Sequence, residues 1–175
     1  MIFFLSDLHF CHDKEFLYAP RGYDNIGDMN KDLIEKWNTT VSDEDIVYLL
    51  GDIILNDDDA GMRCLRQLKG NIHIILGNHD TANRQKLYSE FYDIKYADML
   101  RQGKWSYYLS HYPTIMGDFK DQKRLWNISG HIHSKDKFVN IQNKVYNVSV
   151  DAQNGFPVSL DQIREDIKEQ RSLCV

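Results

Sequence analysis

The chain has 175 residues, of which 42% are hydrophobic and 27% are charged, and its formal net charge is −5. This composition excludes an intrinsically disordered chain, and the length suits a single domain, which we expect to cover 1–175. The acidic balance argues against a protein that binds nucleic acid through a broad basic face. It does not exclude a small anionic substrate, provided that the protein has a local positive centre.

Membrane association and disulfide bonding are both disfavoured. No apolar run approaches the ~20 residues that span a bilayer, and the apolar start, MIFFL, is too short for a signal peptide. We therefore expect a cytoplasmic protein. The three cysteines, Cys11, Cys64 and Cys174, are scattered without a CxxC pair, which argues against a disulfide framework or a cysteine zinc site.

Short β-like runs alternate with helical stretches along the chain, and this pattern predicts an α/β domain. In chain order we expect strand 2–6, helix 28–38, strand 45–50, helix 60–69, strand 72–76, helix 84–92, strands 106–111, 125–129 and 145–150, and helix 159–172. Several strands are near-continuous apolar runs, which are typical of strands covered on both faces. The last helix begins with Ser159 and Gln162 in capping-box spacing.

Polar residues of metal-ligand type stand at the ends of five predicted strands. They are Asp7 and His9 after 2–6, Asp52 after 45–50, Asn78, His79 and Asp80 after 72–76, His111 at the end of 106–111, and His131 and His133 after 125–129. In α/β sheets, sites form in the crevice beyond the carboxyl ends of the strands, so these residues are expected to converge.

The spacing of these residues also favours a shared site. In extended chain, residues i and i+2 face the same way, so Asp7 and His9 are expected to point together, and so are His131 and His133. A glycine comes directly before three of the candidate groups, at Gly51, Gly77 and Gly130, and glycine permits close backbone approach. Each residue alone has an ordinary explanation as a core histidine, a helix N-cap or a turn residue. The repetition at five strand ends favours the metal site.

Seven of these residues, two carboxylates, four imidazoles and one amide, form a mixed oxygen and nitrogen donor set. Zinc, manganese and iron accept such a set, whereas calcium and magnesium prefer oxygen alone. One ion cannot use seven ligands, but two ions can if one carboxylate bridges them. Ion pairs ~3.5–4 Å apart are a recurrent device for phosphoryl hydrolysis.

The ordered blocks SDLH (6–9), GD (51–52), GNHD (77–80), SHYP (110–113) and GHIH (130–133) resemble those of the calcineurin-like metallophosphoesterase superfamily. With EKWN at 35–38, the chain is similar to its short bacterial and phage members. The resemblance implies an α/β fold in which a two-sheet β-sandwich is flanked by helices. It also implies a pair of ions, usually manganese, iron or zinc. One ion would be held by Asp7, His9, Asp52 and His133, and the other by Asp52, Asn78, His111 and His131.

The resemblance further implies a mechanism. A hydroxide that bridges the metals attacks phosphorus, and His79, oriented by Asp80, donates a proton to the leaving oxygen. The two ions contribute more positive charge than Asp7 and Asp52 return, so an acidic protein can still attract a phosphate ester. Whether that small substrate is a monoester or a diester, and whether it is a nucleotide, stays open, as does the oligomeric state.

The loops at 10–27 and 113–124 are expected to set specificity. In the first loop, His12 and Arg21 are candidates to contact the substrate phosphate, with Tyr18 or Tyr23 stacking on a base or sugar; the alternative is a plain surface loop. The chain has no P-loop, HExxH or GxSxG motif, which disfavours an NTPase, a metalloprotease and an α/β-hydrolase. A second interpretation is a catalytically inactive metal-binding scaffold of the same fold, against which an intact His79 argues.

Overall fold

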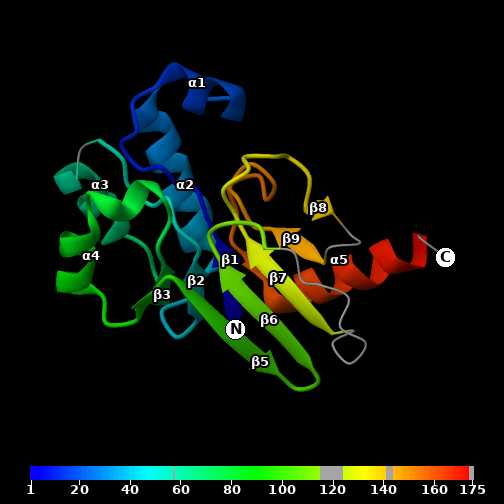
Figure 1. Cartoon of the computed structure of the whole chain (residues 1–175). Helices are drawn as coiled ribbons and strands as arrows, with labels where there is room; N and C mark the ends of the chain where they lie inside the picture. The colour runs from blue at the N-terminus through cyan, green and yellow to red at the C-terminus, as the bar shows by residue number, and fades with distance from the viewer. Residues whose placement is uncertain (57, 115–123, 141–143, 174–175) are drawn as a thin grey trace.

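The structure, a computed structural model, describes residues 1–56, 58–114, 124–140 and 144–173. Residues 115–123 of the loop at 113–124, which is expected to contribute to specificity, lie outside the described residues. The described chain forms two five-stranded mixed sheets with helices packed against them (Figure 1), which confirms the fold class expected from the sequence.

The first sheet has the strand order β10-β1-β2-β3-β4, where β1, β2, β3 and β4 run parallel and β10 is antiparallel to β1. These strands are β1 (Ile2–Leu5), β2 (Ile46–Leu49), β3 (Asn71–Ile75), β4 (Ile94–Lys95) and β10 (Val158–Ser159). The first three match predicted strands to within one or two residues. The other two are only two residues long, too short to leave an alternation pattern in the sequence.

The second sheet has the order β5-β6-β7-β9-β8, with β6, β7 and β9 parallel at its centre and β5 and β8 antiparallel at its edges. The strands are β5 (Ala97–Gln102), β6 (Trp105–Ser110), β7 (Leu125–Ser129), β8 (Phe138–Asn140) and β9 (Val145–Asn147). Strand β5 was not predicted. It is an edge strand with no buried residue, so it carries no run of apolar side chains.

The helices are α1 (Glu15–Tyr18), α2 (Ile26–Thr40), α3 (Asp58–Leu65), α4 (Arg84–Glu90) and α5 (Leu160–Leu173), with short 3₁₀ turns η1 (Ala19–Arg21) and η2 (His79–Thr81). Helix α2 is longer than predicted because Asn25 caps it by accepting a hydrogen bond from the backbone N–H of Asp28. Helix α3 ends at Leu65, four residues earlier than predicted. Each helix in the described ranges is too short or too polar to span a lipid bilayer.

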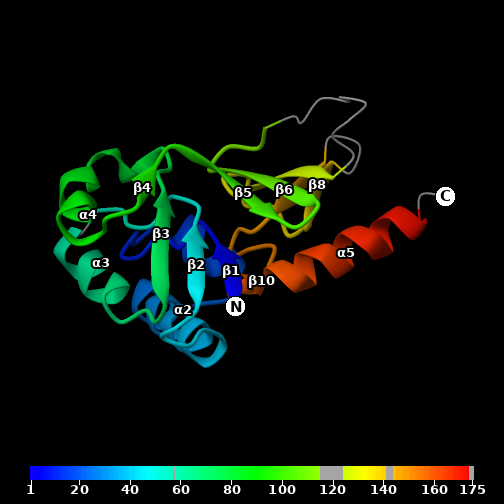
Figure 2. The same cartoon turned by 90° about the horizontal axis from the view of Figure 1, so that it is seen from below.

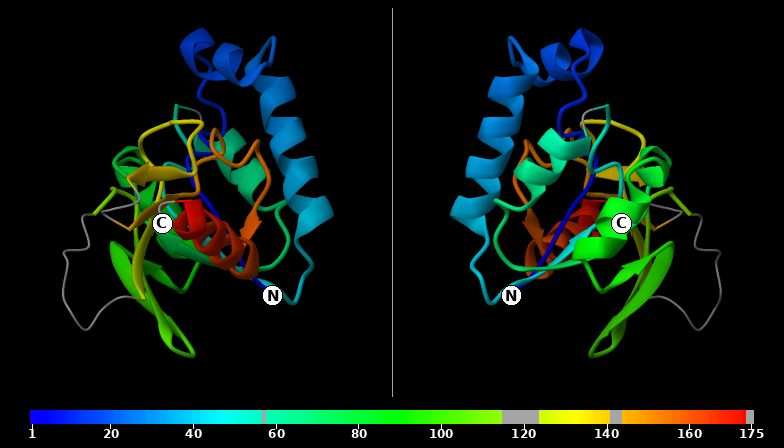
Figure 3. Two further views of the ribbon diagram at one scale, coloured as in Figure 1. Left: turned by 90° about the vertical axis from the view of Figure 1, so that its right-hand side faces the viewer. Right: turned by 90° about the vertical axis from the view of Figure 1, so that its left-hand side faces the viewer.

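Alternation along the parallel strands divides the apolar residues between two cores. Phe3 and Leu5 of β1 face a core shared with α2 and α3, whereas Phe4 faces a core shared with the second sheet and α5. Figure 2 shows α2 and α3 on one side of the first sheet and the second sheet on the other, and the end-on views of Figure 3 place α2 and the second sheet on opposite sides of the molecule. The predicted apolar stripe of α2 is buried, as expected.

Where β1 ends, the two sheets join. The backbone N–H of Ser6 donates to the carbonyl of Val148, and the N–H of Val150 donates to the carbonyl of Ser6, both at 3.0 Å. This link brings the carboxyl ends of the parallel strands of both sheets to one place.

Candidate metal centre

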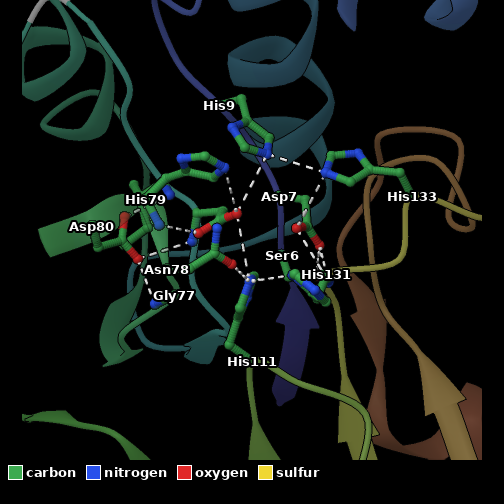
Figure 4. Close-up of polar contacts among 12 residues, drawn as sticks. Ser6, Asp7, His9, Gly77, Asn78, His79, Asp80, His111, His131 and His133 are labelled. Carbon is green, nitrogen blue, oxygen red and sulfur yellow. Dashed lines mark hydrogen bonds and ion pairs between the residues drawn. The ribbon is translucent and has the colours of Figure 1, made fainter.

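The predicted ligands from both sheets converge beyond the strand ends in two adjacent groups (Figure 4). The first group is Asp7, His9 and His133, and the second is Asp52, His111 and His131. Within each group, one donor atom of every residue lies within 4.8 Å of those of the other two. The division agrees with the one that the family resemblance implied.

One carboxylate oxygen, Oδ2 of Asp52, lies between the two groups. It is 3.4 Å from Nε2 of His111 in the second group and 3.7 Å from Nε2 of His9 in the first. The other oxygen of Asp52, Oδ1, accepts the backbone N–H of His79 at 2.9 Å, so the carboxylate cannot rotate freely. Asp52 therefore lies close to residues of both groups.

Other donor atoms face one another across distances that an ion would fill. Nε2 of His9 is 3.2 Å from Nε2 of His133 in the first group. In the second group, Nε2 of His111 is 2.9 Å from Oδ1 of Asn78 and 3.2 Å from Nδ1 of His131. Asn78 therefore lies with the second group, as the resemblance implied.

Strand alternation does not explain how the ligands point, contrary to the expectation from their spacing. Asp7, His9, Asp52, His131 and His133 all have left-handed backbone, with φ between 48° and 74°. Non-glycine residues rarely adopt this conformation, and where they do it is often at functional sites. Asp7 and His9 lie in one group, as expected, but His131 and His133 do not point together, because they belong to different groups.

The glycines before the ligands permit contacts that a side chain would block, as expected. A Cβ on Gly77 would lie 2.2 Å from Oδ1 of Asp52, and a Cβ on Gly130 would lie 2.1 Å from Oγ of Ser6 and 2.3 Å from Oδ2 of Asp7. Such distances are impossible for a methyl carbon. The loops after β1, β2, β3 and β7 therefore pack together only because these positions lack a side chain.

The electrostatics of the site fit a cation. Asp7 is fully buried, and burial raises the pKa of its carboxyl group, which a nearby positive charge would reverse. Burial lowers the pKa of His9 to about 3, and burial together with His111 lowers the pKa of His131, so both rings favour the neutral form that binds metals. His111 directs Nδ1 to the carbonyl of Leu50 at 2.9 Å, which leaves Nε2 for a ligand bond.

Asp80 has partners other than the one expected. Its carboxylate is fully buried and accepts three backbone N–H groups, from Asp52 at 2.9 Å, Ile53 at 2.8 Å and Gly77 at 2.7 Å. Among the described residues, no hydrogen bond joins it to the ring of His79. Asp80 therefore fixes the loop after β3 against the loop after β2, and its influence on His79 passes through the backbone.

The expected proton donor, His79, stands at the edge of the centre. Its side chain is 44% exposed, and Nε2 lies 3.9 Å from Oδ2 of Asp52. Its ring lies edge-on to the ring of His9, with centroids 5.5 Å apart. The ring is thus close to both groups and is open to solvent on one side.

Arg21 is not a free phosphate-binding group. Its side chain is 6% exposed, and its guanidinium donates to both oxygens of Asp151, at 3.0 and 2.8 Å, and to the backbone carbonyl of Asp7 at 3.0 Å. This placement does not support the expected direct contact with substrate. His12, the other candidate, is buried beside His9, with ring centroids 5.6 Å apart.

Asp151 is a site residue that the sequence analysis missed. Its Oδ2 accepts a hydrogen bond from Nδ1 of His133 at 3.0 Å, which turns Nε2 of that ring toward Asp7, 3.6 Å away. Burial alone would raise the pKa of Asp151, but His133 and Arg21 lower it to about 2. The signal was present, because Asp151 directly follows the predicted strand 145–150, as the other site residues follow theirs.

Comparison with known proteins agrees with this geometry. Residues 1–171 match the family described as calcineurin-like phosphoesterase. An uncharacterized protein of Methanocaldococcus jannaschii, MJ1445, is 37% identical over 168 residues, 93% of this chain and 88% of its own. The gene 66 protein of a Mycobacterium phage is 29% identical and is covered over 96% of both chains. The fold is shared with AQ665, a protein of unknown function from Aquifex aeolicus, at a TM-score of 0.75 and 22% identity over 94% of this chain and 98% of that one. The chain therefore belongs to the calcineurin-like phosphoesterase family.

Proposed function

We propose that this protein is a metal-dependent phosphoesterase with two ions in its centre, which hydrolyses a small phosphate ester. The observation that carries this proposal is the pair of donor groups on either side of Oδ2 of Asp52, with His79 next to that oxygen. Membership of the family supports ester hydrolysis in general. The number of ions, their identity and the substrate are our inference.

The two groups of donor atoms support the following assignment of ligands. Asp7, His9 and His133 would hold one ion, Asn78, His111 and His131 the other, and Asp52 both. Neutral imidazoles together with carboxylate and amide oxygens suit manganese, iron or zinc. Bound ions would neutralise the phosphate oxygens and lower the pKa of a water molecule so that it can attack phosphorus.

We assign the role of general acid to His79. Its Nε2 lies 3.9 Å from Oδ2 of Asp52, and its side chain is 44% exposed to solvent. It would donate its proton to the leaving oxygen as the ester bond breaks. Asp80 would position it through the loop that both residues share, and His12 would contact the phosphate from beside His9.

The test compares two leaving groups in the His79→Ala variant loaded with manganese. An alkyl leaving group needs protonation, so kcat should fall by roughly 10²–10⁴ with a dialkyl phosphate. A p-nitrophenolate leaves without a proton, so the loss should be much smaller with a p-nitrophenyl ester. Both variant and wild type should contain two ions per chain by elemental analysis.

His73→Ala is the matched control, because His73 is a partly exposed histidine of β3 that pairs with Asp93 outside the centre. This variant should behave as wild type with both esters. Equal loss with both leaving groups in His79→Ala would exclude the general-acid role. If metal-loaded wild type hydrolysed no phosphate ester at all, the protein would be the inactive scaffold of the alternative interpretation.

A further inference from the structure

Three rings in contact, those of His9, His12 and Phe16, form a row from the metal centre to the surface. The ring of His9 lies 5.6 Å from that of His12, and the ring of His12 meets that of Phe16 edge-on at 5.7 Å, measured between centroids. His9 also contacts His79. The row of rings therefore begins beside His79, the proposed proton donor, and ends at Phe16 on α1.

Phe16 differs from the other aromatic residues of the loop at 10–27. Its side chain is 72% exposed, whereas Phe10 is fully buried and Tyr18 and Tyr23 pack against the first core. The hydroxyl of Tyr23 is also bonded to Asp32. The two tyrosines that were expected to stack on a substrate are thus occupied, and Phe16 offers the free aromatic face.

His12, whose ring lies between those of His9 and Phe16, carries a buried polar nitrogen without a partner in the described part of the chain. The residue is only 9% exposed, and its Nδ1 has no hydrogen-bond partner among the described residues. Burying an unpaired polar nitrogen costs free energy, which a ligand that bonds it would recover.

We propose, resting on the phosphoesterase function above, that the preferred substrate is an ester whose leaving alcohol carries an aromatic ring, and that this ring packs against Phe16. In an ester bound at the centre, the leaving oxygen faces His79 and the leaving group extends toward His12 and Phe16. The nitrogen of His12 would bond the oxygen-rich part of the ester, while the apolar face of Phe16 receives the ring. A nucleoside or an aryl-methyl alcohol satisfies these requirements.

The test uses two esters that differ only in the ring, benzyl methyl phosphate and cyclohexylmethyl methyl phosphate, with manganese-loaded protein and chromatographic measurement of the released alcohol. Aromatic contacts of this kind are worth about a factor of ten, so kcat/KM of wild type should favour the benzyl ester by roughly tenfold. Phe16→Ala should abolish the preference by lowering kcat/KM for the benzyl ester alone. Phe16→Tyr should retain it.

Two matched variants test whether the substrate ring packs against Phe16 or against an exposed tyrosine. Tyr92 is a fully exposed aromatic residue beyond α4, and Tyr92→Ala should leave the preference unchanged. Tyr112 is half exposed and contacts His111 and His131 at the opposite end of the centre. A preference that survives in Phe16→Ala but disappears in Tyr112→Ala would overturn the proposal, and so would a wild type with no preference.

Binding measurements test the aromatic subsite independently of whether the protein hydrolyses an ester. Calorimetry with benzylphosphonate and cyclohexylmethylphosphonate needs no turnover. If neither ester is hydrolysed but benzylphosphonate binds about tenfold more tightly in a manner that depends on Phe16, the aromatic subsite stands and the catalytic proposal falls. Equal affinity of the two phosphonates would overturn the subsite whether or not the protein is an enzyme.

Discussion

The ring of His133 is oriented by the carboxylate of Asp151, which follows a different strand and binds Nδ1, the nitrogen that faces away from the centre. Asp151 accepts the Nδ1 proton of His133 and also accepts hydrogen bonds from Nε and Nη2 of Arg21. A carboxylate behind a metal-binding histidine fixes the tautomer and raises the basicity of the ligand nitrogen. His111 has only a neutral backbone carbonyl in that position. The two groups therefore differ in the partners of their histidines, and we expect them to differ in metal affinity.

Asp151→Asn should weaken metal binding at the first group by roughly 10–100-fold, because the amide can support His133 only weakly and leaves Arg21 without its anion. Equilibrium dialysis against manganese should show that one ion per chain binds with lower affinity and that the other binds with unchanged affinity. Asp136→Asn, an exposed residue three positions after His133, is the control and should bind as wild type does. An equal loss of affinity for both ions would contradict the assignment of Asp151 to the first group.

The space at Gly130 gives a second prediction for single residues. In Gly130→Ala the new methyl group would overlap Ser6 and Asp7, so the loop after β7 must move away from Asp7. We expect a loss of about 1–3 kcal/mol in the free energy of unfolding and loss of the ion at the first group. Gly22→Ala separates this effect from backbone strain, because Gly22 has φ 91° but open space around it. It should cost about 1–2 kcal/mol and leave metal binding intact, as urea titration and dialysis can show.

At the scale of elements, α5 is attached to the second sheet by a polar cluster as well as by its apolar stripe. The buried carboxylate of Asp166 is hydrogen-bonded to the hydroxyl of Tyr146, to Nζ of Lys137 at 2.9 Å and to Nε2 of Gln162 at 2.7 Å. Half of the predicted capping box forms, since Ser159 accepts the N–H of Gln162. The side chain of Gln162 turns to Asp166 instead of returning to the cap.

Asp166→Ala should therefore destabilise the protein by about 2–4 kcal/mol, since it leaves the hydroxyl of Tyr146 buried without an acceptor. Thermal unfolding should show a fall of roughly 5–10 °C in Tm. Asp161→Ala is the matched control on the same helix, because Asp161 is 83% exposed and pairs with Arg164 at the surface. It should leave Tm nearly unchanged.

The same variant predicts a pH dependence. Burial alone would raise the pKa of Asp166, but the hydrogen bonds from Tyr146, Lys137 and Gln162 outweigh it and hold the pKa below its ordinary value of 3.8. A carboxylate with a depressed pKa stabilises the folded state above its unfolded pKa and loses this contribution as pH falls through the folded value. The difference in stability between wild type and Asp166→Ala should be constant from pH 7 to about pH 5 and shrink below pH 4. A difference that grows with acid would contradict the ion-pair origin.

The elements that sequence predicted well are those that the core constrains on both faces. Strands β1, β2, β3, β6 and β7 are central and apolar, so their positions were predicted nearly correctly. Strand β5 was missed because an edge strand pairs through its backbone and needs no apolar pattern. Helix α3 was predicted too long because Leu68 is buried from the turn that follows the helix, and periodicity cannot distinguish a turn from another helical residue.

For the whole molecule, the parallel strands explain why the site was visible in sequence. Polar residues at the strand ends were predicted to converge, and the two groups that the structure brings together consist of them. What sequence could not provide was orientation. The left-handed backbone at Asp7 and His131, and the inward turn of Asp80 and Arg21, depend on contacts between loops that are distant in the chain. Asp151 was missed because its strand end was not counted with the others.

Each group also connects the two sheets. Asp7, His9 and Asp52 come from the first sheet, and His111, His131 and His133 come from the second. An ion bound to such a set cross-links the sheets and stabilises the folded state by mass action, because the unfolded chain does not hold the ligands together. At a concentration 100 times Kd, one ion contributes about 2.7 kcal/mol, which corresponds to roughly 5–10 °C in Tm.

Addition of manganese to chelator-treated protein should therefore raise Tm by at least this amount in a scanning calorimeter, and removal should reverse the rise. His79→Ala, which alters no proposed ligand, should show the full increase. Asp52→Asn, which removes the shared carboxylate, should show little. If all three proteins gained equally, the ions would bind outside the centre, and if wild type gained nothing, the two sheets would not be joined by metal. The outcome does not depend on turnover, so it tests the metal centre separately from the reaction proposed for it.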